Sequence, residues 1–368
     1  MTARKFLVQC TLLALPIAML FALVAWVDPY SLYGTGGPIP RELKEKNLYH
    51  SGRTMPFSNT MWKLIDFRRT PSPNILLGDS RLSRFDVDSL QHFTGDSYFN
   101  FGIPGGNFVT IDRLFHYADS VTELKHVVVQ VAFRGMEMHQ NFDSYEEPRM
   151  ILEKPWSYVH NRRVMEAAGL NLVSNYFPSL LSYDVPGAGN WEMVLAAEKE
   201  SAEHFVIDTT VYGRLQKIAD RCHAEGADLI FVEYPTHPDL QHIMSAAGLG
   251  SEREAYLERL RTMARVIDLD QPGLFPSDRS FWRDPLHLTV DAQRMLIRIS
   301  GDRIDRSKSK CQRCGSVPGV LLPTPGQVQA KTECAFEEVV TPVADIGIDG
   351  PATHVVLSAH VQVGVEPL

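Results

Sequence analysis

The stretch Ile75-Leu76-Leu77-Gly78-Asp79-Ser80-Arg81 predicts a short buried strand that ends in a tight turn with a serine at its tip. Its apolar run lies between Pro73 and Gly78, as is typical of an interior strand of a parallel sheet. Ser80 then falls at the carboxyl end of the strand and at the start of the next helix, where open α/β sheets bind their ligands. Gly-Asp-Ser alone is also a common turn, and these residues by themselves favour that simpler interpretation.

A second stretch, Trp282 to Thr289 (WRDPLHLT), places Asp284 and His287 three residues apart in a predicted loop before a helix-like segment. Nucleophilic acyl transfer needs a His that takes the proton of a Ser and an acid that fixes the tautomer of this His. One loop can supply both groups. Asp-x-x-His alone favours a solvated surface His. His237 follows a later strand on the same side of the sheet and could line the site, but an ordinary loop His is favoured.

Together the two motifs resemble the SGNH (GDSL-type) hydrolase superfamily. In that superfamily, Gly-Asp-Ser after the first strand supplies the nucleophile, and Asp-x-x-His before the last helix supplies acid and base. The resemblance covers about residues 70 to 300 and implies that Ser80, Asp284 and His287 are catalytic. We interpret Asp79 as a structural turn residue and expect Arg81 to pair locally, with an anionic substrate as its alternative partner.

The resemblance also implies an oxyanion hole. Residues 100–107 (NFGIPGGN) follow the second predicted strand, where the family places a Gly whose N–H enters this hole. Gly105 is the best match and would act with the N–H of Ser80, while Gly102 and Gly106 are alternatives. The family's Gly-x-Asn-Asp block is missing, because residues 127–134 read VVVQVAFR. The usual Asn side chain is therefore absent unless another residue replaces it.

Strand and helix patterns alternate from residue 74 onward. Apolar strands are predicted at 74–77, 97–101, 127–132, 228–232 and 266–269, and helices at 78–93, 107–118, 201–224 and 251–264. This alternation predicts an α/β fold with a central parallel sheet of about five strands and helices on both faces. The resemblance implies a flavodoxin-like three-layer α/β/α arrangement for an SGNH-like catalytic domain at 74–302.

Residues 134–200 interrupt the alternation with an insertion that contains Trp156 and Trp191. A long insertion after a strand is more often a lid or binding element than a plain loop. Its aromatic side chains could stack on sugar rings, or they could form a small core of the insertion itself. Residues 28–73, rich in Gly and Pro and then in charge, are predicted to be a juxtamembrane linker.

The N-terminus is predicted to be a membrane anchor that precedes the domain. Residues 6–27 form an apolar run long enough to span a bilayer, after a short basic segment at 1–5. Basic residues favour the cytoplasmic side. We therefore expect a single-pass, uncleaved signal anchor in the inner membrane, with the catalytic domain on the periplasmic or extracellular side. A cleaved signal peptide is the alternative.

Composition and the C-terminal tail limit which partners, cofactors and metals are expected. The net charge of −8 over 368 residues, without a dominant basic stripe, argues against nucleic acid as a partner. We expect no cofactor, since the chain has no phosphate loop or dinucleotide fingerprint.

The tail at 303–368 has no assigned role. Its Cys311, Cys314 and Cys334, with a His, could form a zinc site, but a local disulfide or a disordered tail is favoured, and we expect no metal.

These features predict a cell-envelope serine enzyme, an esterase or a transferase, that acts on ester-linked acyl (acetyl) groups of a polysaccharide or glycoconjugate. The segment that starts at Asp28-Pro29-Tyr30 looks like membrane-anchored SGNH-type proteins of bacterial exopolysaccharide systems, and relatives in alginate acetylation add the transferase option. A membrane protein would then deliver the acyl donor. The alternative is a non-catalytic scaffold or carbohydrate-binding subunit of an exopolysaccharide assembly complex.

Overall fold

The computed structural model describes residues 3–34, 36–49, 55–83, 85–138, 143–180 and 191–296. The tail at 303–368, with Cys311, Cys314 and Cys334, lies outside these ranges, and so do the predicted zinc site and disulfide. Within the described ranges, no three His, Cys, Asp or Glu side chains are grouped so that they could hold a metal ion.

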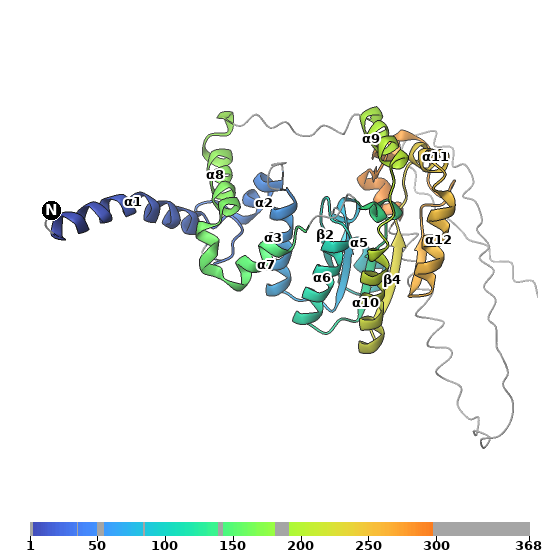
Figure 1. The fold of residues 1–368 in the computed structure, drawn as a ribbon, viewed down its shortest axis with the longest axis horizontal. Coiled ribbons are helices and arrows are strands. Elements are labelled where there is room, and N and C mark those ends of the chain that lie inside the picture. Colours follow the sequence, from blue (N-terminus) through green and yellow to red (C-terminus); the bar gives the residue numbers. More distant parts are fainter. Residues whose placement is uncertain are drawn as a thin grey trace, which may run out of the picture. The chain divides into compact units, whose positions relative to one another are not determined.

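A five-stranded parallel sheet forms the centre of the fold, as the alternating pattern predicts (Figure 1). Its order is β2-β1-β3-β4-β5, and all neighbouring strands run parallel. The strands are β1 (Asn74–Gly78), β2 (Phe99–Gly102), β3 (His126–Gln130), β4 (Asp228–Glu233) and β5 (Arg265–Asp268). A separate antiparallel pair consists of β6 (Trp282–Asp284) and β7 (His287–Leu288).

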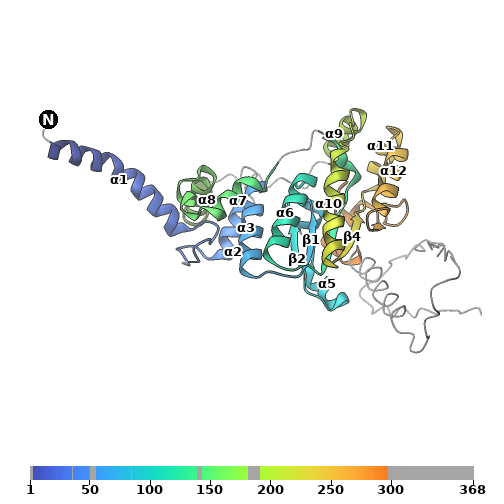
Figure 2. The ribbon, with the colours of Figure 1, turned by 60° about the horizontal axis from the view of Figure 1, so that its bottom comes forward.

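Helices flank the sheet. They are α4 (Ser80–Ser83), α5 (Val87–Thr94), α6 (Phe108–Val121), α9 (Trp191–Glu203), α10 (Thr210–Glu225), α11 (Pro238–Ala246) and α12 (Gly250–Arg261), with the short 3-10 turns η1 (Phe133–Met136) and η5 (Arg279–Phe281). In Figures 1 and 2, α6 and α10 run alongside the strands, and they contact β1 and β4 respectively.

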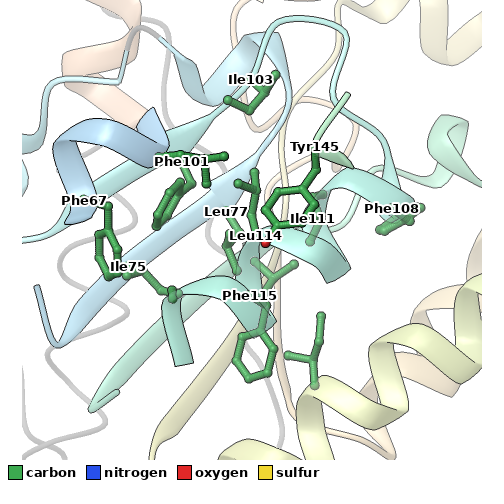
Figure 3. Close-up of a cluster of buried hydrophobic side chains, with 14 of the residues drawn as sticks. Phe67, Ile75, Leu77, Phe101, Ile103, Phe108, Ile111, Leu114, Phe115 and Tyr145 are labelled. Carbon is green, nitrogen blue, oxygen red and sulfur yellow. The ribbon is translucent and has the colours of Figure 1, made fainter. Parts of the chain in front are cut away.

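Alternation along β1 sends neighbouring side chains into two different hydrophobic clusters. Ile75 and Leu77 join one cluster with Phe101, Leu114 and other buried residues (Figure 3), whereas Leu76 joins the second. A strand that is apolar at every position is expected where both sheet faces are covered. All five residues of β1 are buried, which fixes the strand whose end carries Ser80.

The N-terminal helix α1 (Ala3–Val27) is long and apolar enough to span a membrane, and a signal sequence has the same properties. Its mean hydropathy over the most apolar window is 2.4, and 11% of that window is buried. Only its last turns enter the protein core, through Val24 and Val27.

The structure differs from the expected linker at 28–73. This segment contains α2 (Arg41–Tyr49) and α3 (Met55–Arg69). Phe57, Met61 and Leu64 keep helical spacing along α3 and are fully buried in the main core. Their burial explains the helix, since an amphipathic face is stabilised mainly by what it packs against. The polar residues 58–60 and Lys63 lie between these positions and hide the pattern in the sequence.

The insertion at 134–200 divides into two parts. One part comprises α7 (Glu146–Glu153), η3 (Pro155–His160), α8 (Arg162–Tyr176) and η4 (Pro178–Leu180). Here α7 packs on α3, and α8 packs on α1 and α2, so these helices cover α1 and the segment at 28–73, whereas the sequence favours a lid or binding element. Tyr158 is buried within this part, whereas Trp156 is 69% exposed. The other part is α9, which packs on α11.

Candidate active site

Ser80 is the first residue of α4 and follows the turn after β1, at the carboxyl edge of the sheet. Contacts from neighbouring elements hold this turn. Asn100 on β2 donates its side-chain N–H to the carbonyl of Leu82 at 2.9 Å, and the hydroxyl of Ser83 donates to the carbonyl of Ser80 at 2.8 Å. Gly102 lies so close to α4 that a Cβ there would be 2.5 Å from the nitrogen of Ser83. The serine therefore stands on a turn fixed from both sides.

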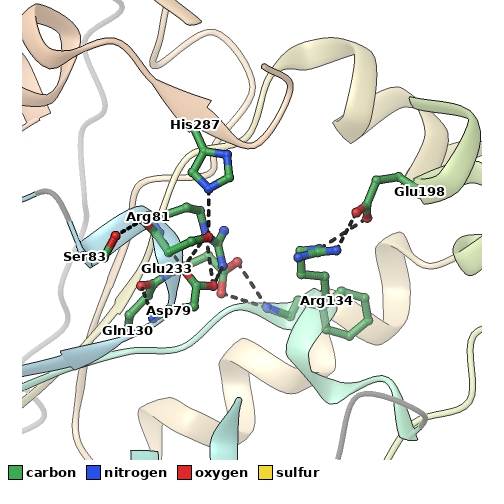
Figure 4. A network of polar contacts seen from close by, with 10 residues as sticks. Asp79, Arg81, Ser83, Gln130, Arg134, Glu198, Glu233 and His287 are labelled. Atoms are coloured by element: carbon green, nitrogen blue, oxygen red, sulfur yellow. Dashed lines mark hydrogen bonds and ion pairs between the residues drawn. The ribbon is translucent and has the colours of Figure 1, made fainter. Parts of the chain in front are cut away.

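The residues on either side of Ser80 form a buried ion pair (Figure 4). Arg81 donates from Nη2 to Oδ2 of Asp79 at 2.7 Å, and Gln130 on β3 donates to Oδ1 of Asp79 at 2.9 Å. Gln130 also accepts the backbone N–H of Asp79 at 3.1 Å. Burial would raise the pKa of Asp79, but the charge and hydrogen bonds of Arg81 lower it to about 2. Asp79 is thus a structural turn residue and Arg81 pairs locally, as the sequence predicts.

His287 and Asp284 lie opposite each other on the hairpin β6-β7, instead of in the irregular loop that the sequence favours. The two-residue turn of Pro285 and Leu286 explains their separation of three. The Nδ1–H of His287 donates to the carboxylate of Asp284, at 2.7 Å from Oδ1 and 2.9 Å from Oδ2. Asp284 also accepts the backbone N–H of Leu286 at 3.0 Å.

The Oγ of Ser80 lies 2.8 Å from the Nε2 of His287 (Figure 4). Because Nδ1 donates its proton to Asp284, Nε2 of a neutral imidazole is free to accept the proton of Ser80. Burial raises the pKa of Asp284, but hydrogen bonding to His287, the charge of His287 and the Leu286 N–H together lower it below its ordinary value. The structure thus brings the three predicted residues into one hydrogen-bonded chain that ends in an ionised carboxylate.

His237 supports this hairpin from behind. Its backbone N–H donates to the carbonyl of Pro285 at 2.9 Å, and its Nε2–H donates to the carbonyl of Ser277 at 2.9 Å. The ring is only 3% exposed and meets Trp191 and Trp282 edge-on. His237 is therefore a loop residue, as the sequence favours, but a buried structural one, and it does not join the Ser80 chain.

The predicted oxyanion loop is held against the end of β1. Ile103 donates its N–H to the carbonyl of Gly78 at 3.0 Å, and Gly106 donates to Ile103 at 2.7 Å. Gly105, between them, has a φ of +74°, which favours glycine. Its role in an oxyanion hole stays a prediction. The loop after β3 offers Val131, Ala132 and Phe133 where the family has its Asn.

Sequence reasoning missed the buried polar residues that lie beneath this site. Gln130 ends β3, Glu233 ends β4, and Asp270 follows β5, so all three occur where an apolar strand stops. Their positions at the carboxyl ends of predicted strands could have identified them in the sequence, because the ligand-binding residues of parallel sheets gather at this edge. Glu233 accepts the backbone N–H of Phe133 at 3.2 Å.

Comparison with known proteins adds little. No family model and no curated protein matches this chain. Among solved structures, it is similar to a protein from Streptococcus pneumonia that is provisionally described as a platelet activating factor. The two share 12% identity over 71% of this chain and 96% of the other, with a TM-score of 0.36. A TM-score this low supports neither a fold nor a function.

Proposed function

We propose that this chain is a membrane-anchored serine acyl-transfer enzyme of the SGNH (GDSL) type. The observation that carries the proposal is the hydrogen-bonded chain from Ser80 through His287 to Asp284 at the carboxyl edge of the sheet. A nucleophile, a base and an orienting acid within hydrogen-bond reach are the parts that this chemistry requires. The strand order and the two hydrophobic clusters support the family's flavodoxin-like, three-layer arrangement.

In the proposed reaction, Nε2 of His287 takes the proton of Ser80 as Oγ attacks the carbonyl carbon of an ester. The ionised Asp284 stabilises the imidazolium that forms. The N–H groups of Ser80 and Gly105 bind the oxyanion, and loss of one such donor typically lowers kcat by about 10²–10³-fold. His287 then returns the proton to the leaving alkoxide, so that an acyl-Ser80 remains. Water or a sugar hydroxyl, deprotonated by His287, attacks the acyl carbon, and His287 passes this proton to Oγ of Ser80 as the bond between the acyl group and Ser80 breaks.

The anchor and the resemblance together support a cell-envelope substrate. We propose an acylated polysaccharide or glycoconjugate, an acetyl ester above all, outside the inner membrane, with a membrane protein as the source of the acyl donor. The length and hydropathy of α1 support the anchor. Hydrolysis and transfer differ in how well the site excludes water from the acyl-enzyme. The same motifs serve both reactions, so they do not distinguish an esterase from a transferase.

One observation favours the alternative of a non-catalytic scaffold or carbohydrate-binding subunit. The loop after β3 lacks the family's Asn, and the nearby Arg134 is paired with Glu198. A site without this donor would stabilise an oxyanion less well.

A fluorophosphonate probe separates the two functions, because it labels only an activated serine. We expect the full chain to be labelled, Ser80→Ala and His287→Ala to lose labelling, and Ser120→Ala, at an exposed serine of α6, to retain it as the matched control. If the folded wild-type chain is not labelled, the scaffold function is favoured. A labelled enzyme that releases the alcohol of the acyl donor only when a sugar acceptor is present, with the acetyl group on the sugar and no free acetate, would be a transferase.

A further inference from the structure

A cavity of about 150 Å³ lies beside the proposed active site, at the carboxyl edge of the sheet. The residues that line it include Arg81, Phe133, Glu233, Met244, Leu249 and Arg253. Ser80, Asp284 and His287 are not among its lining residues. Arg81 connects the two places, because it follows Ser80 directly in the turn after β1. The cavity is therefore a second candidate site, next to the first.

The unused hydrogen-bonding capacity of this cavity lies in donors. Arg81 is 5% exposed and gives Nε and Nη2 to Asp79, while its buried Nη1 has no hydrogen-bond partner. Arg253 gives Nη2 to Asp268 at 2.7 Å, while its buried Nε makes no hydrogen bond and lies 3.8 Å from Oδ2 of Asp270. A buried donor without an acceptor is costly, and two on guanidinium groups of one cavity indicate a missing ligand.

The carboxyl groups of the cavity are occupied in other ways. Asp270 accepts hydrogen bonds from Thr236 and Gln241 and pairs with Arg253 at 3.8 Å, and Glu198 is paired with Arg134. Glu233 already accepts the backbone N–H of Phe133, and burial and the nearby Asp270 raise its pKa well above its usual range. The cavity thus has more free donors than acceptors. A ligand with acceptor oxygens fits this balance, and a cation does not.

The remaining wall is apolar, with Phe133, Met244 and Leu249 among its residues. Guanidinium groups bind both carboxylate and phosphate. A phosphate dianion, which is strongly hydrated and lacks an apolar body, would leave this wall without a partner. A cavity of this volume suits a body of about six non-hydrogen atoms, since one of similar size holds benzene.

We propose that this cavity binds a small carboxylate with a short apolar chain, the carboxylate on Arg81 and Arg253 and the chain against Phe133, Met244 and Leu249. Butyrate is the simplest such ion. Its binding does not depend on the acyl-transfer activity proposed above. Bound there, butyrate would contact Arg81, which directly follows the proposed nucleophile Ser80.

Methionine-methyl NMR tests the proposal, because Met244 lines the cavity. Sodium butyrate is titrated into the full chain in detergent with ¹³C-methyl methionine, and Met244→Leu assigns the resonance. We expect a saturable shift of the Met244 methyl group at millimolar butyrate, and at least tenfold weaker binding of n-butanol, which lacks the carboxylate. Ser80→Ala should bind butyrate as the wild type does, because Ser80 does not line the cavity.

Arg253→Lys keeps a cation for Asp268 but removes the guanidinium donor. We expect at least tenfold weaker binding, since a hydrogen bond to a charged group typically changes affinity about ten- to a hundredfold. Arg259→Lys, on the same helix and exposed, is the matched control and should bind normally.

Three results would overturn the proposal: no shift of the Met244 resonance in the folded wild type, equal binding of butanol, or loss of binding in Ser80→Ala. The absence of a shift would mean that water alone fills the cavity. Loss of binding in Ser80→Ala would mean that butyrate binds at Ser80 instead. If Arg253→Lys is unfolded, the comparison of butyrate with butanol on the wild type still tests whether binding requires the carboxylate. Fluorophosphonate labelling tests the acyl-transfer function separately, so either proposal can fail alone.

Discussion

Asp79 and Arg81 stand on either side of Ser80 and bind each other, with Nη2 of Arg81 2.7 Å from Oδ2 of Asp79. Their side chains close the turn beneath the serine, and Gln130 fastens this pair to β3. The pair is almost fully enclosed, with Arg81 only 5% exposed.

Replacing Asp79 with Asn should destabilise the protein by roughly 3–5 kcal/mol, because Arg81 would keep its charge in the interior without a carboxylate. Urea unfolding at neutral pH measures this loss. The lowered pKa of Asp79 gives the sign of the pH dependence. Its contribution is full above the ordinary Asp pKa of about 3.9 and is lost as the pH falls through about 2. A variant as stable as the wild type at pH 7 would contradict a structural role for this pair.

Replacing Asp284 with Asn should lower kcat/KM toward p-nitrophenyl acetate by about 10³–10⁴-fold, because the amide would favour the wrong tautomer of His287. The fold should persist, since an Asn oxygen can still accept the N–H of Leu286. A melting temperature near that of the wild type is the control. An unchanged rate in a folded variant would remove Asp284 from the proposed mechanism.

Replacing Glu233 with Gln tests the buried carboxyl group at the end of β4. Because its pKa is raised, the stability from the protonated form is full below the ordinary Glu pKa of about 4.3 and is lost as the pH rises through the raised value. Gln imitates the protonated form, so the melting temperature of the variant should equal that of the wild type in mild acid. In alkali the wild type is destabilised by the ionised Glu233, and the variant should melt about 2–4 °C higher for each 1 kcal/mol of this destabilisation that it avoids. Melting curves from pH 4.5 to 9 measure this difference. Glu203→Gln, on the exposed end of α9, should show no such trend.

Replacing Gly102 with Ala should disturb the serine turn from the side of β2. The new Cβ would lie 2.5 Å from the nitrogen of Ser83 and 2.6 Å from the carbonyl carbon of Leu82, so the backbone of α4 must move. We expect a loss of about 1–3 kcal/mol in stability and slower fluorophosphonate labelling of Ser80. Gly213→Ala is the matched control, because no neighbouring atom lies within 4 Å of its Cβ position in α10. It should stabilise the chain by about 0.5–1 kcal/mol. Equal labelling rates in the two variants would show that α4 tolerates the shift.

The local pattern of the sequence was sufficient for the central sheet. Ile75 to Leu77 and Val127 to Val129 are unbroken apolar runs, and each forms a buried strand at the predicted place. Motif order likewise anticipated that Ser80 would meet His287, although 207 positions separate them.

What the sequence did not reveal depends on contacts between distant segments. Phe57 reads as part of a charged connector, yet it is buried because α3 packs under α7. Gln130 has no local pattern that marks it, and its importance appears only when β3 lies beside β1. The polar contacts of Arg253 likewise depend on how α12 meets the end of β5.

The end of α1 also bears on how the chain could be processed. Val24 and Val27 are buried in the domain's core, and the carboxylate of Asp28 accepts hydrogen bonds from Tyr158, Leu32 and Tyr33. A peptidase that cut just before Asp28 would remove two core side chains and leave a new charged amine beside this carboxylate. Maturation by proteolysis would therefore weaken the folded domain where α1 enters it, so retention of the helix and integrity of the domain are coupled.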